Sequence, residues 1–384
     1  MTVKHYRIGV MFSTTGSYSA VARSMLNGAL LAFQEAGALP GLTVEPVIVN
    51  PNGDLSRYAE LSQELIASGI RHVIGGYTSS SRKEVIPCFE KNDALLWYPS
   101  HYEGFESSSN VIYTGASPNQ HVLPLIDYMV AHAGPRVFCV GSNYIWAWEN
   151  NRILREAIAD QGGRVLAERY FAVGDAGMQQ VVDDILAARP DFVFNTLIGT
   201  SAYSFFRLFR ATCVARGIDQ PRQIPIASCS LSEPELEEIG PDAVDGHLSS
   251  SVYFSSLDTP ANRAFTDSYS AAYPDGPAVS ADAEASYDAA KLLIQSLAEA
   301  GTDEVAEIKR VVGRQRLVAP QGDVWIDPQT LHAWLTPRIG RSTADARFDV
   351  LVEAPAPVRP DPYLIQTSPR FALSARVPIL KVVK

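Results

Sequence analysis

Short apolar segments alternate along this chain with longer segments of helical periodicity, and this alternation limits the fold more than any other feature. A strand is predicted at 6–12, and the helix after it carries Val21, Met25 and Phe33 on one face. Parallel strands need long crossovers, which are usually helices, so the pattern predicts a parallel sheet covered by helices. The same rhythm predicts strands at 42–49, 72–74 and 94–97 and helices over 58–66 and 79–90.

A second series of strands and helices begins after Pro118. Its predicted strands lie at 136–140, 164–171 and 192–196, and its predicted helices at 148–159 and 178–188. Two series in tandem predict an α/β protein of two similar doubly wound lobes with parallel central sheets. The helix after each strand presents free N–H groups at the carboxyl edge of such a sheet, so we expect a ligand site in the cleft between the lobes.

The rest of the chain is expected to connect the two lobes. We expect 252–259 to cross back to the first lobe, helices at 283–300 and 305–312 to pack there, and a third crossing near 320–327. The predicted lobes comprise 1–118 with 256–325, and 119–255 with 326–350. Proline fixes the backbone and removes donors, so the proline-rich residues 351–384 are predicted to form an extended tail that offers a contact surface to a partner.

Composition excludes several classes of function. The 384 residues carry a net charge of -10, and no basic cluster interrupts this negative field. Direct binding to nucleic acid or to an anionic membrane is therefore not expected. The first residues enter a strand without the pattern of a secretory signal, which predicts a cytoplasmic protein, although a chain whose leader had been removed would look the same. No apolar run approaches the roughly 20 residues that cross a bilayer.

Residues that carry chemistry do not assemble into a catalytic or metal-binding motif. The four cysteines are widely spaced, as expected of small buried side chains in a reducing compartment, and the seven histidines lack metal-ligand spacing. GxSxG, P-loop and GxGxxG motifs are missing from the strand-to-helix loops, and His101 beside Glu103 has no nucleophile with its own orienting partner. We therefore expect no catalytic residues, no metal, no cofactor and no enzymatic activity.

Hydroxyl and glycine residues gather in Gly75–Lys83, where a predicted strand gives way to a helix. Tyr77, Thr78 and Ser79 lie in this segment. Glycine lets a ligand approach the backbone, and hydroxyls both donate and accept hydrogen bonds, which suits a carboxylate or a carbonyl oxygen. The alternative is that these residues only cap the helix.

Aromatic residues occupy corresponding loops of both series. The segment after the strand at 94–97 contains Tyr98, Ser100 and Tyr102, and that after 136–140 contains Tyr144 and Trp146. Aromatic walls with a few polar groups fit a small, neutral, partly apolar ligand, whereas a charged ligand would need a counter-charge. Each aromatic alone also fits a core position, but their recurrence at corresponding loops favours a site.

Two further residues are weaker candidates. Thr200 follows a strand and either helps to close the cleft or caps a helix. Tyr253 lies in 253–256, which we interpret as a hinge, and both ligand contact and simple packing in a strand are open for it.

The chain resembles the AmiC family, the amide sensors that negatively regulate aliphatic amidase operons. The resemblance rests on segments spread along nearly the whole chain, at 77–83, 93–99, 102–106, 118–120, 141–145, 253–260, 319–322 and 359–363. It implies a type I periplasmic-binding-protein fold, or Venus flytrap, that closes on a short aliphatic amide. It also implies that Ser79 and Tyr144 hydrogen-bond the amide while Tyr77, Tyr98 and Ser100 shape the pocket. The implied partner is an RNA-binding transcription antiterminator, which the sensor sequesters and then releases when amide binds.

The chain departs from the family pattern at positions that affect ligand size. Ser100 and His101 interrupt a Tyr-Pro-Thr-Pro-Tyr-Glu-Gly pattern, and Trp146 replaces a frequent tyrosine, so that an N–H that only donates stands in place of a hydroxyl.

Two other functions compete with the amide sensor. One is the substrate-binding protein of an ABC transporter for urea, amides or branched-chain amino acids, the last of which need an acidic group such as Glu103 or Glu106 for their ammonium group. The other is a hydrolase of amides. Assembly into a homo-oligomer is also open.

Overall fold

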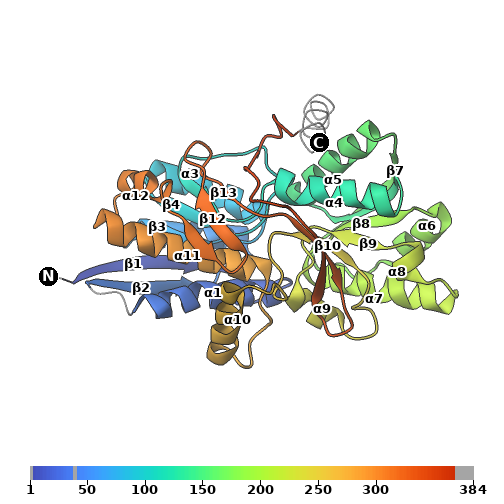
Figure 1. Ribbon diagram of the computed structural model, residues 1–384, viewed down its shortest axis with the longest axis horizontal. Helices are drawn as coiled ribbons and strands as arrows, with labels where there is room; N and C mark the ends of the chain where they lie inside the picture. The colour runs from blue at the N-terminus through green and yellow to red at the C-terminus, as the bar shows by residue number, and fades with distance from the viewer. Residues whose placement is uncertain (1–2, 38–40, 368–384) are drawn as a thin grey trace.

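Two lobes lie side by side in the computed structural model, which describes residues 3–37 and 41–367 (Figure 1). The first lobe contains a five-stranded sheet in the order β2-β1-β3-β4-β5, and all its pairs are parallel. Its strands are β1 (Lys4–Met11), β2 (Leu42–Val49), β3 (His72–Gly75), β4 (Leu95–Tyr98) and β5 (Val111–Tyr113).

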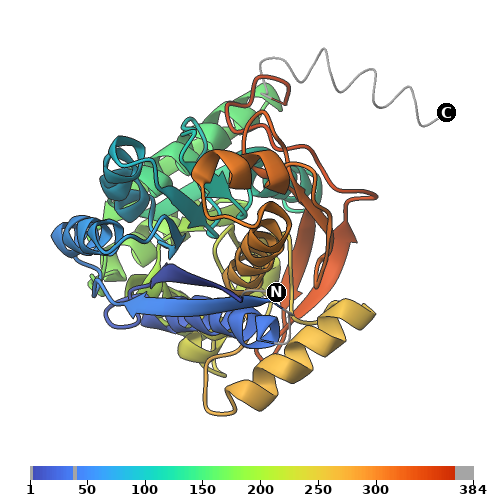
Figure 2. The ribbon, with the colours of Figure 1, turned by 90° about the vertical axis from the view of Figure 1, so that its left-hand side faces the viewer.

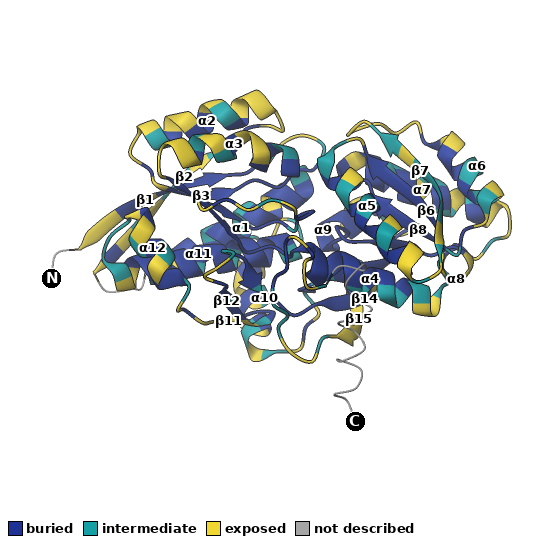
Figure 3. Ribbon diagram, turned by 90° about the horizontal axis from the view of Figure 1, so that it is seen from above, coloured by how far each residue is buried: buried dark blue, intermediate teal, exposed yellow. Residues whose placement is uncertain are grey.

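Helices cover both faces of this sheet. Successive apolar side chains of a strand point to opposite faces, so each face needs a cover. In β1, Ile8 and Val10 join the core beneath α1 (Ser19–Ala36) and α11 (Ala281–Ala300), whereas Met11 joins the core beneath α2 (Leu55–Ala67) and α3 (Ser79–Lys91). Helices α1 and α11 approach closely at Gly28, where a Cβ atom would lie 2.1 Å from the carbonyl oxygen of Ala283. Figure 3 shows α2 and α3 on one side of the sheet and the largely buried α1 and α11 on the other.

The second lobe is built on a seven-stranded sheet in the order β15-β14-β10-β9-β8-β6-β7. The parallel strands are β6 (Arg136–Ser142), β7 (Arg164–Phe171), β8 (Phe192–Thr196), β9 (Ile226–Ser228) and β10 (Leu248–Ser251), and β14 (Arg338–Ser342) and β15 (Phe348–Glu353) are antiparallel. Its helices are α4 (Pro118–His132), α5 (Ile145–Asp160), α6 (Gln179–Ala188), α7 (Gly199–Ala215), α8 (Gln220–Gln223) and α9 (Glu233–Ile239). The predicted fold class, two doubly wound α/β lobes, is confirmed.

The chain passes between the lobes at 114–117, at 252–259 and at 335–337. After the second passage, α10 (Pro260–Ala272) lies on the outside of the first lobe beside α1 (Figure 2). Helices α11 and α12 (Val305–Val312) follow it in this lobe.

The third crossing lies later in the chain than predicted. Residues 320–327 do not leave the first lobe, because Gly322 has a φ of +117° and the chain turns back there into an antiparallel hairpin. The strands of this small sheet are β11 (Leu317–Ala319), β12 (Gly322–Ile326) and β13 (Ala333–Trp334). The expected boundaries after residues 325 and 350 therefore fall inside β12 and β15. Of the expected tail, 368–384 lie outside the described residues.

Candidate ligand-binding cleft

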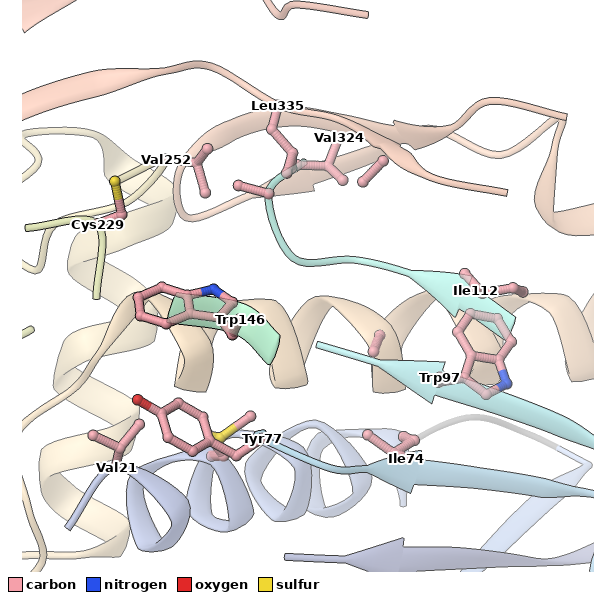
Figure 4. Packing of buried hydrophobic residues seen from close by; sticks show 14 of the residues in the cluster. Val21, Ile74, Tyr77, Trp97, Ile112, Trp146, Cys229, Val252, Val324 and Leu335 are labelled. Carbon is pink, nitrogen blue, oxygen red and sulfur yellow. The ribbon is translucent and has the colours of Figure 1, made fainter. Parts of the chain in front are cut away.

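Loops from both lobes meet at the carboxyl ends of their parallel strands. Strands β3 and β4 supply the loops of the first lobe, and β6 and β9 supply those of the second. A single buried cluster contains Tyr77 of the first lobe with Trp146, Cys229 and Val252. Figure 4 shows the indole of Trp146 above the ring of Tyr77, with Cys229 and Val252 above the indole, so side chains of both lobes gather in this cluster.

The first wall is the start of α3. Thr78 caps this helix, and its hydroxyl accepts a hydrogen bond from the N–H of Ser81 at 3.2 Å. The hydroxyl of Ser79 donates to Glu103 and accepts from Arg82 at 3.3 Å, so its only proton is already used in a hydrogen bond within the protein. The backbone N–H groups of Ser79 and Ser80 are first in the helix and have no intrahelical acceptor. The start of α3 therefore presents backbone donors and a partial positive charge, whereas the predicted hydrogen bond from the Ser79 hydroxyl would compete with Glu103.

A buried cluster of balanced charge supports this wall. The guanidinium of Arg82, which is 0% exposed, donates to Glu103 at 2.8 Å and to Glu106 at 2.7 Å. Lys83 pairs with Glu106, and the rings of Tyr98 and Tyr102 flank the guanidinium. The two cations balance the two carboxylates, and neighbouring Arg82 keeps the pKa of Glu106 below its usual value despite burial. Glu103 and Glu106 are therefore not free to receive a ligand ammonium group.

The second wall comes from the start of α5. The rings of Tyr144 and Trp146 stack with centroids 6.3 Å apart, and Trp146 meets the edge of His101 from the first lobe at 5.5 Å. Trp146 is 2% exposed, and its Nε1–H has no acceptor within the described residues. A buried donor without an acceptor is costly, which marks this indole as a group that a ligand would satisfy.

Two carboxyl groups lie at the cleft without a full set of partners. One carboxylate oxygen of Glu235 accepts from the backbone and hydroxyl of Ser232 at 3.0 and 3.2 Å, in a capping box that starts α9. Burial, followed by the nearby charge of Asp282, raises the pKa of Glu235 to about 8. Asp282 at the start of α11 lies 3.3 Å from Nδ1 of His101.

The carboxyl groups of Glu235 and Asp282 both influence the pKa of Tyr77. Burial, and then the charges of Glu235 and Asp282, raise the pKa of Tyr77 well above its usual value. Tyr203 of α7 also lies near Tyr77, and its buried hydroxyl has no partner in the part of the chain that the structure describes. Two acidic groups and an unsatisfied hydroxyl are therefore near enough to Tyr77 to influence its pKa.

The structure brings together most of the residues predicted from the sequence. Those that lie on the two facing walls or directly behind them are Tyr77, Thr78, Ser79, Tyr98, Ser100, Tyr144 and Trp146. Tyr98 stands behind the wall, because its hydroxyl donates to the carbonyl of Tyr77 at 2.7 Å. The contacts of these residues with a ligand stay a prediction.

The other three predicted residues are not part of the two facing walls. Tyr102 flanks Arg82 in the core of the first lobe, where its ring stacks on Tyr113 and its hydroxyl lies 2.6 Å from Nε2 of His332, so the protein already holds its polar atom. Tyr253 donates to Asn262 at 2.7 Å in a separate cluster, so it is neither in a strand nor at the cleft. Thr200 is exposed, and its backbone N–H bonds to the carbonyl of Ser17 across the lobes at 3.1 Å.

Sequence reasoning missed several cleft residues. Glu235 had a local signal, since Ser232 and Glu235 have the spacing of a capping box after a short strand. Tyr203 and Asp282 had none, because only the packing of α7 and α11 turns them toward the cleft.

These features define a two-lobed ligand-binding protein with its cleft at the carboxyl ends of two parallel sheets. A family model described as a periplasmic binding protein domain matches residues 6–369, and the chain belongs to this family. Among curated relatives, a Leu/Ile/Val-binding protein homolog of Brucella abortus is 22% identical over 334 residues, which is 85% of this chain and 84% of the relative.

Solved structures share the fold at low sequence identity. A solute binding protein of an ABC transporter from Rhodopseudomonas palustris, in complex with p-hydroxybenzoic acid, superposes with a TM-score of 0.84 at 20% identity, covering 94% of this chain and 99% of that one. The branched-chain amino acid transporter substrate binding protein LivJ from Streptococcus pneumoniae, in complex with isoleucine, gives 0.78 at 19% identity, covering 93% and 100%. Within residues 3–37 and 41–367, no helix has the length and hydropathy that a membrane span requires.

Proposed function

We propose that this chain is the solute-binding protein of an ABC transporter and that its cleft closes on a small α-amino acid. One observation carries the proposal, namely that the first lobe offers the free N–H groups of α3 next to Tyr77, while the second lobe offers Glu235, a buried carboxyl near enough to raise the pKa of Tyr77. A ligand carboxylate would bind the start of α3, and its ammonium group would pair with Glu235 and the Tyr203 hydroxyl. The curated relatives support an amino acid as the solute.

The same groups disfavour a simple carboxylic acid. The charge of Arg82 is neutralised by Glu103 and Glu106, so no unpaired cation of the described residues faces the carboxylate of such a ligand. An aromatic acid without an ammonium group would also leave Glu235 and Tyr203 unsatisfied. Tyr144 and Trp146 offer an apolar surface to an aliphatic side chain instead.

Closure follows from the position of these groups on both lobes. A ligand that touches α3 in one lobe and α9 in the other binds the closed state better than an open one, and this difference in affinity drives closure. No role in this scheme requires bond making, so we propose a binding protein without enzymatic activity.

A cytoplasmic amide sensor that sequesters an antiterminator is the second candidate. The resemblance to the AmiC family supports it, and so does Glu235, because a carboxyl with a pKa of about 8 is largely protonated at pH 7 and can hydrogen-bond a neutral amide. The transporter hypothesis requires export and the sensor hypothesis a cytoplasmic protein, so fractionation of cells that make the natural protein separates them.

The pH dependence of binding tests the ligand assignment. Pairing with an ammonium group requires the Glu235 carboxylate, so isoleucine affinity should rise by about tenfold from pH 6 to pH 7 and level off above pH 8. Acetamide needs no carboxylate, and its affinity should not rise over this range. Isothermal titration calorimetry of both ligands measures this.

A matched pair of variants controls the experiment. Glu235→Gln should abolish the pH dependence of isoleucine binding, whereas Glu237→Gln changes an exposed carboxyl of the same helix and should leave it unchanged. Isoleucine affinity that stays flat between pH 6 and pH 8 in the unchanged protein would rule out Glu235 as the ammonium partner.

A further inference from the structure

A small cavity lies at the hinge end of the cleft, next to the loop that carries His101 and Ser100. It has a volume of about 20 Å³ and is lined by residues of both lobes, including His101, His121, Cys229, Ser250 and Asp282. This volume holds one group the size of a water molecule. Although imidazoles, a carboxylate and a thiol line it, no group of such side chains in the described residues has the arrangement of a metal site.

Unsatisfied polar atoms concentrate around this cavity. His121 and Ser250 line it, and the ring of Trp146 packs against His101 of its lining. Nδ1 of His121, the hydroxyl of Ser250 and Nε1 of Trp146 have no hydrogen-bond partner in the described chain. These side chains are only 1% or 2% exposed, so water outside the protein does not satisfy them. Buried polar groups in folded proteins are nearly always paired, and such a cluster indicates a polar occupant.

The hydrogen-bonding roles of these atoms are fixed by their other contacts. Nε2 of His121 lies 3.0 Å from the carbonyl oxygen of Tyr102, so Nε2 carries the proton and Nδ1 is an acceptor. Burial lowers the pKa of His121 to about 3, so the ring stays neutral at physiological pH. The indole of Trp146 only donates. The occupant must therefore both donate and accept at one atom, as a hydroxyl does.

We propose that this cavity is a hydroxyl subsite of the ligand cleft, in which a hydroxyl on the bound solute donates to His121 and accepts from Trp146 or a serine. The inference rests on the proposed function, since it concerns the solute of the same cleft, and it holds for an amino acid and for an amide alike. A water molecule has the same size and roles, so the subsite reveals itself only when a hydroxyl is compared with a methyl group of similar volume.

Two pairs of isosteric ligands make this comparison. Threonine and valine differ by a hydroxyl in place of a methyl group, and so do glycolamide and propionamide. Calorimetric titration of the full chain should show that, in the pair that binds, the hydroxyl ligand binds about tenfold more tightly, because the methyl ligand leaves buried polar groups unsatisfied.

Variants locate the preference in the cavity. Ser250→Ala should reduce the hydroxyl preference by about two- to tenfold through loss of one hydrogen bond, and Trp146→Phe provides a second variant that removes a donor. Ser249→Ala is the matched control, since the hydroxyl of the neighbouring residue in β10 donates to the carbonyl of Leu231 at 2.7 Å. This control should keep the preference of the unchanged protein.

Each outcome decides between the two proposals. Equal affinity for the two members of a binding pair, or a preference that both variants retain in full, overturns the hydroxyl subsite and leaves the proposed function standing. Binding of none of the four compounds overturns both.

Discussion

Two buried ionisable residues of the cleft represent two kinds, one neutralised by its neighbours and one with incomplete partners. Arg82 belongs to the first kind, because its guanidinium contacts Glu103 and Glu106 and lies between two tyrosine rings. Glu235 belongs to the second kind, because one capping residue holds only one of its oxygens. The first kind fixes the wall of the cleft, and the second gives the cleft its selectivity.

Replacing Arg82 tests the structural half of this distinction. Arg82→Met should lower the free energy of unfolding by about 3–5 kcal/mol, because it leaves Glu103 buried without its cation. Urea unfolding at pH 7 measures the loss. Lys83→Met is the control, and since Lys83 is 39% exposed it should cost less than about 1 kcal/mol. Equal effects of the two substitutions would show that burial of the Arg82 pair does not govern stability.

Single residues of the cleft could be predicted only where the local sequence determines their position. Tyr77 to Ser79 follow a buried strand and start a helix, and this pattern was sufficient to place them. Tyr102 lies in an irregular loop, where no periodicity reports the direction of a side chain, so its prediction as a cleft residue was wrong. Glu235 and Tyr203 depend on how distant helices pack, which a single sequence does not show.

Among the elements, the start of α7 makes a direct contact between the lobes. Gly199 has a φ of +59°, and a Cβ atom there would lie 2.3 Å from the carbonyl oxygen of Ser17. The next residue, Thr200, donates its N–H to the same carbonyl group. This backbone contact joins the two lobes, since Ser17 lies in the first lobe and α7 in the second.

A methyl group at this contact should oppose closure. Gly199→Ala should lower the affinity for isoleucine and increase the radius of gyration with ligand in small-angle X-ray scattering, because the lobes cannot approach fully. Gly217→Ala is the matched control, since Gly217 has a φ of +69° but no atom within 4 Å of its Cβ position. The two variants share the backbone strain, so equal ligand affinities in both would show that the Gly199 contact does not limit closure.

At the scale of the whole molecule, the sequence predicted the two lobes because apolar periodicity repeats along the chain. The path between the lobes was harder to predict, since one glycine at the β11–β12 turn decides whether 320–327 cross or fold back. Such a decision depends on a single backbone angle, which leaves no periodic signal.

The titration of the whole molecule gives the last prediction, because buried histidines and buried carboxyl groups have opposite effects on stability. Burial lowers the pKa of four histidines, so unfolding takes up protons below pH 6.5 and acid destabilises the fold. These histidines, with pKa values of about 3 or 4, are His72, His121, His247 and His332. Burial raises the pKa of several carboxyl groups, so unfolding releases their protons above about pH 4.5 and stability falls as the pH rises. Three of them, with pKa values of about 7 or 8, are Glu233, Glu235 and Glu284, and the pKa of Asp288 is raised as well.

The two effects oppose each other between pH 4.5 and pH 6.5, and above pH 6.5 only the carboxyl groups remain. The melting temperature should therefore be highest near pH 6 and should fall toward pH 8. The free energy of unfolding should decrease by about 1 kcal/mol per pH unit for each carboxyl group that is protonated in the folded protein and ionised in the unfolded chain. Differential scanning calorimetry at constant ionic strength measures this. Glu235→Gln should flatten the curve between pH 7 and pH 8, because the pKa of Glu235 is raised to about 8 and this group titrates in that range. A melting temperature that rises from pH 6.5 to pH 8 would mean that these carboxyl groups are already ionised in the folded protein. Glu235 would then carry a negative charge before a ligand binds.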